Sequence, residues 1–290
     1  MITNTVIPIP PSYYKDESIN LDDTLKYLKF LSSSGIETVM TTAGTSQFNL
    51  LTIDEIHSLN KTICMGYSKN KIIGIPPLSL RETKKFIKAA NDYADSKTKY
   101  LILYPERHYD NNTIRQFFYQ IKQDTDADFY VHTMALRSGT GGDWEYESGL
   151  LKDLFNESLV VGIKEEYSNI QHAFNFVSEL PKEMDVVVAG GSMRRHNFLK
   201  IAGANSFLGG IGNLFPEIEL DYCINEKEHS LILETKLFDV FMKFGWHKSL
   251  RIGISYLGLG CDYDRMPWSM RDDECKRDIA NCIEDIKNEK

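Results

Sequence analysis

The chain has 290 residues, of which 42% are hydrophobic and 26% charged, and its formal net charge is −8. This composition is ordinary for a globular protein, and the length fits one α/β barrel. Acidic and basic residues are interspersed, which argues against a nucleic-acid-binding surface and against a polybasic membrane patch.

The cysteines and the N-terminus indicate where the protein works. The five cysteines are odd in number and include no C-x-x-C pair, so neither a disulfide framework nor a structural zinc site is expected. The first residues lack the basic and apolar regions of a signal peptide, and no apolar run reaches transmembrane length. The sequence therefore predicts a cytoplasmic protein.

Short apolar runs rich in Val and Ile alternate with helical patterns along most of the chain. Such runs are typical of parallel strands that helices cover, and eight of them in one chain predict a (β/α)8 barrel. The runs are Thr5–Ile9, Thr38–Thr42, Lys71–Ile75, Tyr100–Leu103, Asp128–Val131, Leu159–Lys164, Val186–Ala189 and Asn205–Leu208.

Helix signals complete the predicted architecture. Thr52–Glu55 and Ser79–Glu82 both fit the capping box that opens a helix. Beyond the eighth strand, three more segments have helical patterns, namely Glu228–Phe244, Lys248–Leu257 and Arg271–Lys287. We therefore predict a barrel over residues 1–222 and a C-terminal helical extension over residues 223–290, packed on the barrel as one structural unit.

The sixth apolar run ends in Lys164. Because side chains alternate along a strand, Gly162 and Lys164 share a face, and barrel active sites lie at the C-terminal ends of strands. Partial burial lowers the pKa of a lysine, and the neutral amine can attack a ketone to form an iminium ion. Taken alone, however, the strand favours a lysine that extends from its end into solvent.

Two other segments carry polar groups to the same end of the predicted barrel. In the first, Tyr130 and His132 share a strand face, and the following turn contains Arg137, which could pair with a carboxylate through two hydrogen bonds. In the second, Thr41–Thr52 is a turn of small residues whose amides and hydroxyls could approach an anion. Each segment by itself is also compatible with an ordinary surface loop.

Together the three segments resemble the dihydrodipicolinate synthase and N-acetylneuraminate lyase family of class I aldolases, over nearly the whole chain. Gly162-Ile163-Lys164-Glu165 matches the family's lysine strand. Arg137 and Gly139 match its arginine turn, Leu51–Glu55 matches a helix start, and Arg265-Met266-Pro267 resembles its C-terminal R-x-P.

The resemblance implies roles for individual residues. Lys164 would form the Schiff base, the turn of Gly44, Thr45 and Ser46 would bind the substrate carboxylate, and Gly190 would line the substrate site with its backbone. It also implies a mechanism without metal or cofactor, and a homotetramer or homodimer.

The departures from the family pattern matter as much as the matches. His132 stands where the family has its proton-transferring tyrosine, and Gly44 replaces the first of two neighbouring threonines. The segment Pro105–Tyr109 has no tyrosine directly after its proline, although His108 in this loop could contact substrate. These differences argue against a true dihydrodipicolinate synthase.

Glu165 and most of the histidines are expected to have structural roles. The pair Glu165-Glu166 could serve in acid–base chemistry, but parity turns Glu165 outward when Lys164 points inward. The histidines other than His132 and His108, His247 among them, show no metal-ligand spacing and are interpreted as solvated or core residues.

The sequence thus predicts a Schiff-base lyase for a 2-oxo acid, either pyruvate or a sugar acid that releases pyruvate. His132 would shuttle protons, its unperturbed pKa placing that step between about pH 5 and 8, and Arg137 would bind the second substrate. Two alternatives stay open. One is a dehydratase of a sugar-derived acid, which also uses Lys164 but releases no free aldehyde. The other is a non-catalytic protein that binds a small acid, which the replaced tyrosine favours and the retained lysine disfavours.

Overall fold

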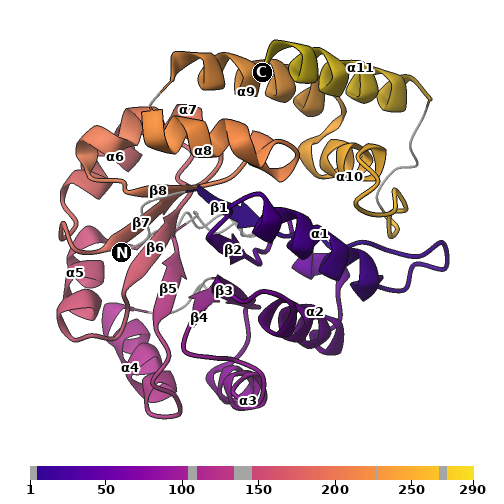
Figure 1. Cartoon of the computed structure of the whole chain (residues 1–290). Helices are drawn as coiled ribbons and strands as arrows, with labels where there is room; N and C mark the ends of the chain where they lie inside the picture. Colours follow the sequence, from indigo (N-terminus) through magenta and orange to yellow (C-terminus); the bar gives the residue numbers. More distant parts are fainter. Residues whose placement is uncertain (1–4, 104–109, 134–145, 226, 268–272) are drawn as a thin grey trace.

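The strands form a closed parallel barrel, and the predicted fold is confirmed (Figure 1). A computed structural model describes residues 5–103, 110–133, 146–225, 227–267 and 273–290. Each strand pairs with the next along the chain, and the eighth closes onto the first. The strands are β1 (Thr5–Pro8), β2 (Thr38–Met40), β3 (Asn70–Ile75), β4 (Thr98–Ile102), β5 (Phe129–His132), β6 (Gly162–Glu165), β7 (Asp185–Val188) and β8 (Ser206–Leu208).

Helices follow the strands and cover the outside of the barrel. They are α1 (Leu21–Ser33), α2 (Ile53–Gly66), α3 (Leu80–Ala90), α4 (Asn111–Lys122), α5 (Ser148–Asn156), α6 (Ile170–Ser178), α7 (Ser192–Leu199) and α8 (Pro216–Asn225), with short 3-10 turns η1 (Phe48–Leu50), η2 (Lys200–Ala202) and η3 (Ile211–Asn213). At the start of α2 the predicted capping box is complete, since Thr52 and Glu55 bond each other's backbone amides. At the start of α3, Ser79 accepts from the Glu82 amide, while the Glu82 carboxylate pairs with Lys85.

The barrel interior explains the glycine beneath Lys164. The Tyr130 hydroxyl donates to Asp185 Oδ2 at 2.5 Å across the inside of the barrel. A Cβ atom at Gly162 would lie 2.6 Å from Tyr130 Cε1 and 2.6 Å from the Asp185 carbonyl oxygen, closer than real Cβ contacts. Only glycine leaves room there for the buried tyrosine ring.

We expect Gly162→Ala to destabilise the protein by about 1–3 kcal/mol, the usual cost of forcing an extra methyl group into a packed interior. Denaturant unfolding measures this loss. The matched control is Gly149→Ala in α5, where an added Cβ meets nothing within 4 Å and alanine is the better helix former. A Gly162→Ala protein as stable as wild type would contradict the close packing of β6.

Three helices form the C-terminal extension: α9 (Glu228–Phe244), α10 (Trp246–Tyr256) and α11 (Asp273–Glu289). They pack on one another, and α9 also contacts α7 and α8 of the barrel. The predicted helices correspond closely to these three. The predicted boundary between residues 222 and 223 falls inside α8. The division of the chain into barrel and extension at this point stays a prediction. Among the described helices, none is both long and apolar enough to span a membrane.

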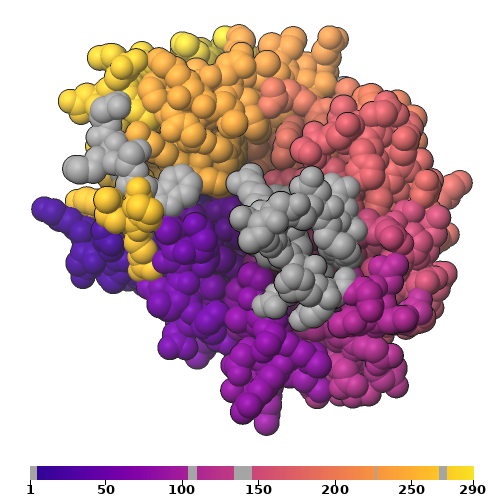
Figure 2. Space-filling model, turned by 180° about the vertical axis from the view of Figure 1, so that it is seen from behind, coloured from indigo at the N-terminus to yellow at the C-terminus, as the bar shows by residue number. Residues whose placement is uncertain are grey.

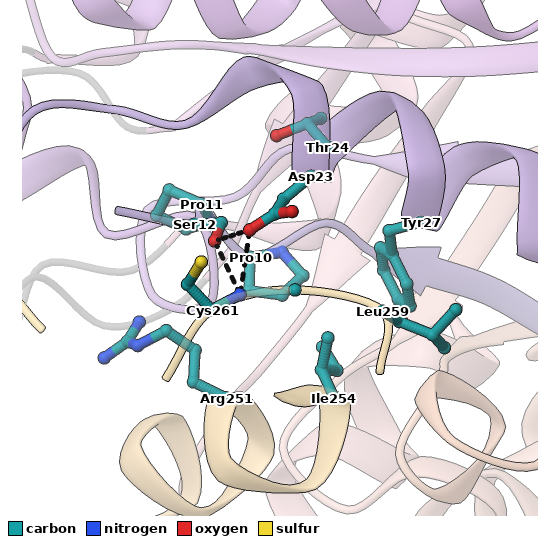
Figure 3. Close-up of a pocket in the computed structure, with 11 residues that line it drawn as sticks. Pro10, Pro11, Ser12, Asp23, Thr24, Tyr27, Arg251, Ile254, Leu259 and Cys261 are labelled. Atoms are coloured by element: carbon teal, nitrogen blue, oxygen red, sulfur yellow. Dashed lines mark hydrogen bonds between the residues drawn. The ribbon is translucent and has the colours of Figure 1, made fainter. Parts of the chain in front are cut away.

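Two sets of contacts fasten the segment after α10 to the barrel. Arg265 donates from Nη1 to the Leu50 carbonyl at 2.7 Å and pairs with both oxygens of Glu55, which holds the Glu55 pKa at about 2. The Cys261 amide donates to Asp23 Oδ2 at 2.8 Å and to Ser12 Oγ at 3.2 Å (Figure 3). The pocket beside these residues has a volume of about 10 Å³, room for no more than one water molecule.

Candidate active site

A cavity of about 680 Å³ opens at the C-terminal end of the strands. This is the end at which (β/α)8 enzymes build their active sites. His132 and Lys164 line it from the barrel, and helices α9 and α10 line it with Phe238, Met242, Trp246 and His247. Figure 2 shows the extension, orange to yellow, beside the purple N-terminal units of the barrel. The cavity is therefore walled by the barrel and the extension together.

Lys164 lies inside this cavity and not on a solvated strand end. It is 3% exposed, and the register of β5 and β6 places it directly beside His132. Its Nζ atom lies 2.9 Å from His132 Nε2. The parity argument from the sequence, which put both side chains on the interior face, thus agrees with their positions.

Glu166 completes a triangle with these two residues. Its Oε2 atom contacts Lys164 Nζ and lies 2.8 Å from His132 Nε2. Its side chain is 31% exposed, whereas those of Lys164 and His132 are almost fully buried. The carboxylate therefore joins the buried amine and imidazole to the open part of the cavity.

The electrostatics of the triangle set the protonation of its members. Burial and the neighbouring Lys164 cation lower the pKa of His132 to about 4, although Glu166 acts in the opposite direction. Burial would raise the pKa of the Glu166 carboxyl, but Lys164 and His132 together hold it well below its usual range. At neutral pH the imidazole is thus neutral and Glu166 is ionised. The His132 pKa of about 4 lies below the window of pH 5 to 8 that the unperturbed pKa of histidine predicted.

Among the described residues, none fixes the tautomer of His132 through Nδ1. Within the described residues, the buried Nδ1 atom has no hydrogen-bond partner. Metal-binding and catalytic histidines usually have one ring nitrogen held by a second hydrogen bond, which determines where the proton sits. Without such a bond, Nε2 can either donate to Glu166 or accept from Lys164.

The neighbouring glutamate has a different role. Glu165 is fully buried and pairs with Arg195 of α7, with Nε–Oε2 and Nη2–Oε1 distances of 3.0 and 2.5 Å. It also accepts a hydrogen bond from the Tyr167 amide. Glu165 therefore points away from the cavity, as its parity predicted, and fixes the chain that leaves β6.

The small-residue turn contributes to the cavity in part. Gly44 and Thr45 line it, whereas the Ser46 hydroxyl is buried and bonds the Ile9 carbonyl at 2.6 Å and the Thr42 amide at 3.0 Å. The amide of Thr45 donates to Thr42 Oγ1, and that of Ser46 to the Thr42 carbonyl. These two amides and the Ser46 hydroxyl thus have partners within the protein. Thr45 lines the cavity, as does Thr42, whose hydroxyl accepts from the Thr45 amide.

Gly190 backs the triangle. It lines the cavity and adopts a φ of +72°, in the left-handed region that favours glycine. A Cβ atom there would lie 3.4 Å from Glu166 Cγ. Its backbone therefore lies close beside the Glu166 side chain. The other two predicted site residues, Arg137 and His108, lie outside the described residues.

Several lining residues were missed or misinterpreted in the sequence. His247 was interpreted as a solvated or core histidine, but it lines the cavity, and its ring Cε1 is 3.5 Å from the position of a Cβ on Gly44. The reason is that α10 begins at Trp246 and directs its first turn at the cavity. For Glu166, the sequence offered only a weak indication of a role in the site, because the pair Glu165-Glu166 could serve in acid–base chemistry. Within the described residues, no three His, Cys, Asp or Glu side chains gather as metal ligands.

Comparison with known proteins agrees with the fold. No family model matches the chain. The 4-hydroxy-tetrahydrodipicolinate synthase of Karelsulcia muelleri (strain GWSS) is 25% identical over 162 residues, which are 53% of this chain and about half the length of that synthase.

Solved structures match over nearly the whole chain. A sialic acid aldolase from Ruminococcus gnavus superimposes with a TM-score of 0.84 at 16% identity, covering 99% of this chain and 98% of its own. A prophage protein of the dihydrodipicolinic acid synthase family from E. coli K12, in complex with pyruvate, gives 0.83 at 14% identity and 99% of both chains. Dihydrodipicolinate synthase from Oceanobacillus iheyensis gives 0.78 at 20% identity, over 98% of this chain and 96% of its own. The predicted resemblance to this family is confirmed at the level of the fold.

Proposed function

We propose that this chain, which has the fold of the dihydrodipicolinate synthases and N-acetylneuraminate lyases, is a lyase that forms a Schiff base between Lys164 and a 2-oxo acid. One observation carries the proposal. The Lys164 amino group is buried at the end of a barrel strand, inside a cavity, and touches both an imidazole and a carboxylate. A lysine so placed is suited to attack a ketone.

The reaction follows from this arrangement. The Lys164 nitrogen bonds to the ketone carbon, and the ketone oxygen leaves as water, which gives an iminium ion. His132 takes the proton from a substrate hydroxyl on the second carbon from the iminium carbon. The bond between that carbon and the first one breaks, and its electron pair moves into the iminium to form an enamine. An aldehyde is released. The enamine then takes a proton at carbon, and water returns pyruvate and the free lysine.

The substrate is proposed from the cavity and from the relatives. A volume of about 680 Å³ is within the usual range for small-molecule sites and accommodates a 2-oxo acid with a chain of several carbons. The E. coli K12 relative is described in complex with pyruvate. Because His132 replaces the family's tyrosine, we propose an activity other than dihydrodipicolinate synthesis. We also propose that the protein is cytoplasmic, as its cysteines indicate, and that it is a homotetramer or homodimer, as the resemblance implies.

Borohydride trapping tests the proposal. The wild-type protein is incubated with pyruvate or with one of a panel of other 2-oxo acids and reduced with borohydride, and its intact mass is measured by mass spectrometry. In a second assay, the protein is incubated with candidate sugar acids and the released free aldehyde is measured. One adduct per chain together with aldehyde release supports the lyase. An adduct with dehydrated product and no aldehyde supports the dehydratase instead. If the protein binds small acids but forms a covalent adduct with none of them, the result would support the non-catalytic alternative.

Thr45→Val is expected to weaken binding of pyruvate itself. Thr45 lines the cavity, and losing a hydrogen bond from its hydroxyl to a carboxylate would cost about 1.5–3 kcal/mol, or about 10- to 160-fold in affinity. The pyruvate concentration that gives half-maximal trapping measures this change. Thr45→Ser, which keeps the hydroxyl, is the matched control and should stay near wild type. Equal trapping by the Val and Ser variants would exclude Thr45 from the carboxylate site.

A further inference from the structure

Glu166 is the member of the triangle that the proposed reaction has not yet used. Its Oε2 atom is in contact with Lys164 Nζ, the atom that forms the covalent bond, and with His132 Nε2. Its side chain also lines the cavity and is 31% exposed. A carboxylate that touches the reacting nitrogen and reaches the space where the substrate oxygen would lie can exchange protons with both.

Schiff-base formation needs such a group because of its proton balance. A lysine ammonium and a ketone give a protonated iminium and one water molecule. The nitrogen therefore gives up two protons, and the departing oxygen takes up both. Nitrogen and oxygen are bonded to the same carbon, so direct transfer would pass through a strained four-membered arrangement. A positioned acid–base group that faces both atoms removes this difficulty.

We propose that Glu166 is this group: it accepts a proton from the Lys164 ammonium, passes it to the ketone oxygen, repeats the transfer as the carbinolamine loses water, and ends as a carboxylate beside the iminium. This inference rests on the proposed Schiff-base function. Each transfer leaves the proton count unchanged, and no other reactant is required.

His132 is less suited to this task. Its ring is 2% exposed, and Nε2 is the one nitrogen in contact with both Lys164 and Glu166. We therefore assign the protons of Schiff-base formation to Glu166, and the protons of bond cleavage to His132.

Two measurements separate these roles. The first is the rate of iminium formation, obtained by mixing enzyme with pyruvate, quenching with borohydride at increasing times, and counting the adduct by intact mass. The second is exchange of the pyruvate methyl protons for deuterium in D2O, followed by NMR, which reports proton transfer at carbon. Glu166→Gln should slow iminium formation at least ten-fold, which is less than the usual 10²–10⁴-fold of an acid–base group because water can reach this partly exposed position. His132→Phe should slow methyl exchange more than iminium formation.

Rescue distinguishes a proton carrier from a residue that only holds the site in shape. Iminium formation by Glu166→Ala should recover with added acetate, and Glu166→Asp should be faster than Glu166→Gln. Glu217→Gln, at an exposed glutamate of α8 paired with Lys290, is the control and should match wild type. Folding of each variant is checked by thermal melting.

The outcomes separate the two proposals. If wild-type protein forms no adduct with any 2-oxo acid, the proposed function itself fails. If wild type forms the adduct and Glu166→Gln forms it equally fast, the inference about Glu166 fails while the function stands. Slow variants that acetate does not rescue, with Asp no better than Gln, would also overturn the proton-carrier role.

Discussion

Lys164→Arg will abolish the covalent adduct that wild type forms with pyruvate and borohydride. The guanidinium stays protonated at every accessible pH and cannot attack a ketone. The fold should persist, because an arginine at this position keeps its positive charge beside the Glu166 carboxylate. Intact-mass and peptide mass spectrometry should place the whole wild-type adduct on residue 164 and find none in the variant.

Two other lysines make the test specific. Lys182→Arg, at an exposed position, should trap as wild type does. Lys71 is also fully buried, but it pairs with Asp95 and donates to the Tyr67 carbonyl, away from the cavity lining. Lys71 is therefore not expected to form an adduct. An adduct found on Lys71, or one that persists in Lys164→Arg, would show that the Schiff-base residue has been misassigned.

His132→Phe is expected to lower turnover about 10²–10⁴-fold, the usual contribution of a general acid–base group, while trapping at Lys164 persists more slowly. A control is His57→Phe, since His57 stacks on Phe86 at a centroid distance of 3.8 Å, outside the cavity lining. The steady-state rate with the substrate found by the aldehyde assay gives the comparison. Turnover unchanged in His132→Phe would eliminate the shuttle role.

The pH profile provides a second view of His132. A histidine that acts as a base must be neutral before it accepts a proton. Since the pKa of His132 is lowered to about 4, its base form is fully present between pH 5 and 8 and is lost as the pH falls through about 4. An acidic limb near pH 4 that disappears in His132→Phe is expected. A limb near 6.5 in the wild type would mean that the imidazole is far less buried during turnover than in the free protein.

The sequence predicted the barrel because parallel strands are buried on both faces and so appear as continuous apolar runs. The same rule placed Lys164 and His132 together, since parity holds for as long as the chain remains a strand. Glu166 lies one residue beyond the end of β6 at Glu165, where alternation is no longer guaranteed. Its carboxylate nevertheless lies on the Lys164 side, as alternation from Lys164 would have placed it.

Residues that reach the cavity from far along the chain were beyond local rules. His247 approaches Gly44 only because α10 packs over the turn after β2, and nothing in the spacing of histidines encodes that packing. Ser46 illustrates the opposite case. A small polar residue in a turn can offer its hydroxyl to a ligand or to the turn itself, and here the Ile9 carbonyl and the Thr42 amide take it.

The division of the cavity wall between barrel and extension has a consequence for how such a protein can diverge. The side chains proposed to react, Lys164, His132 and Glu166, are held by β5, β6 and the chain that follows β6. Much of the opposite wall comes from Phe238, Trp246 and their neighbours in α9 and α10. Substitutions in these two helices can change which molecules fit while leaving the reacting atoms in place. Preference for a substrate can thus drift between lineages through one part of the gene, while the chemistry is inherited through another.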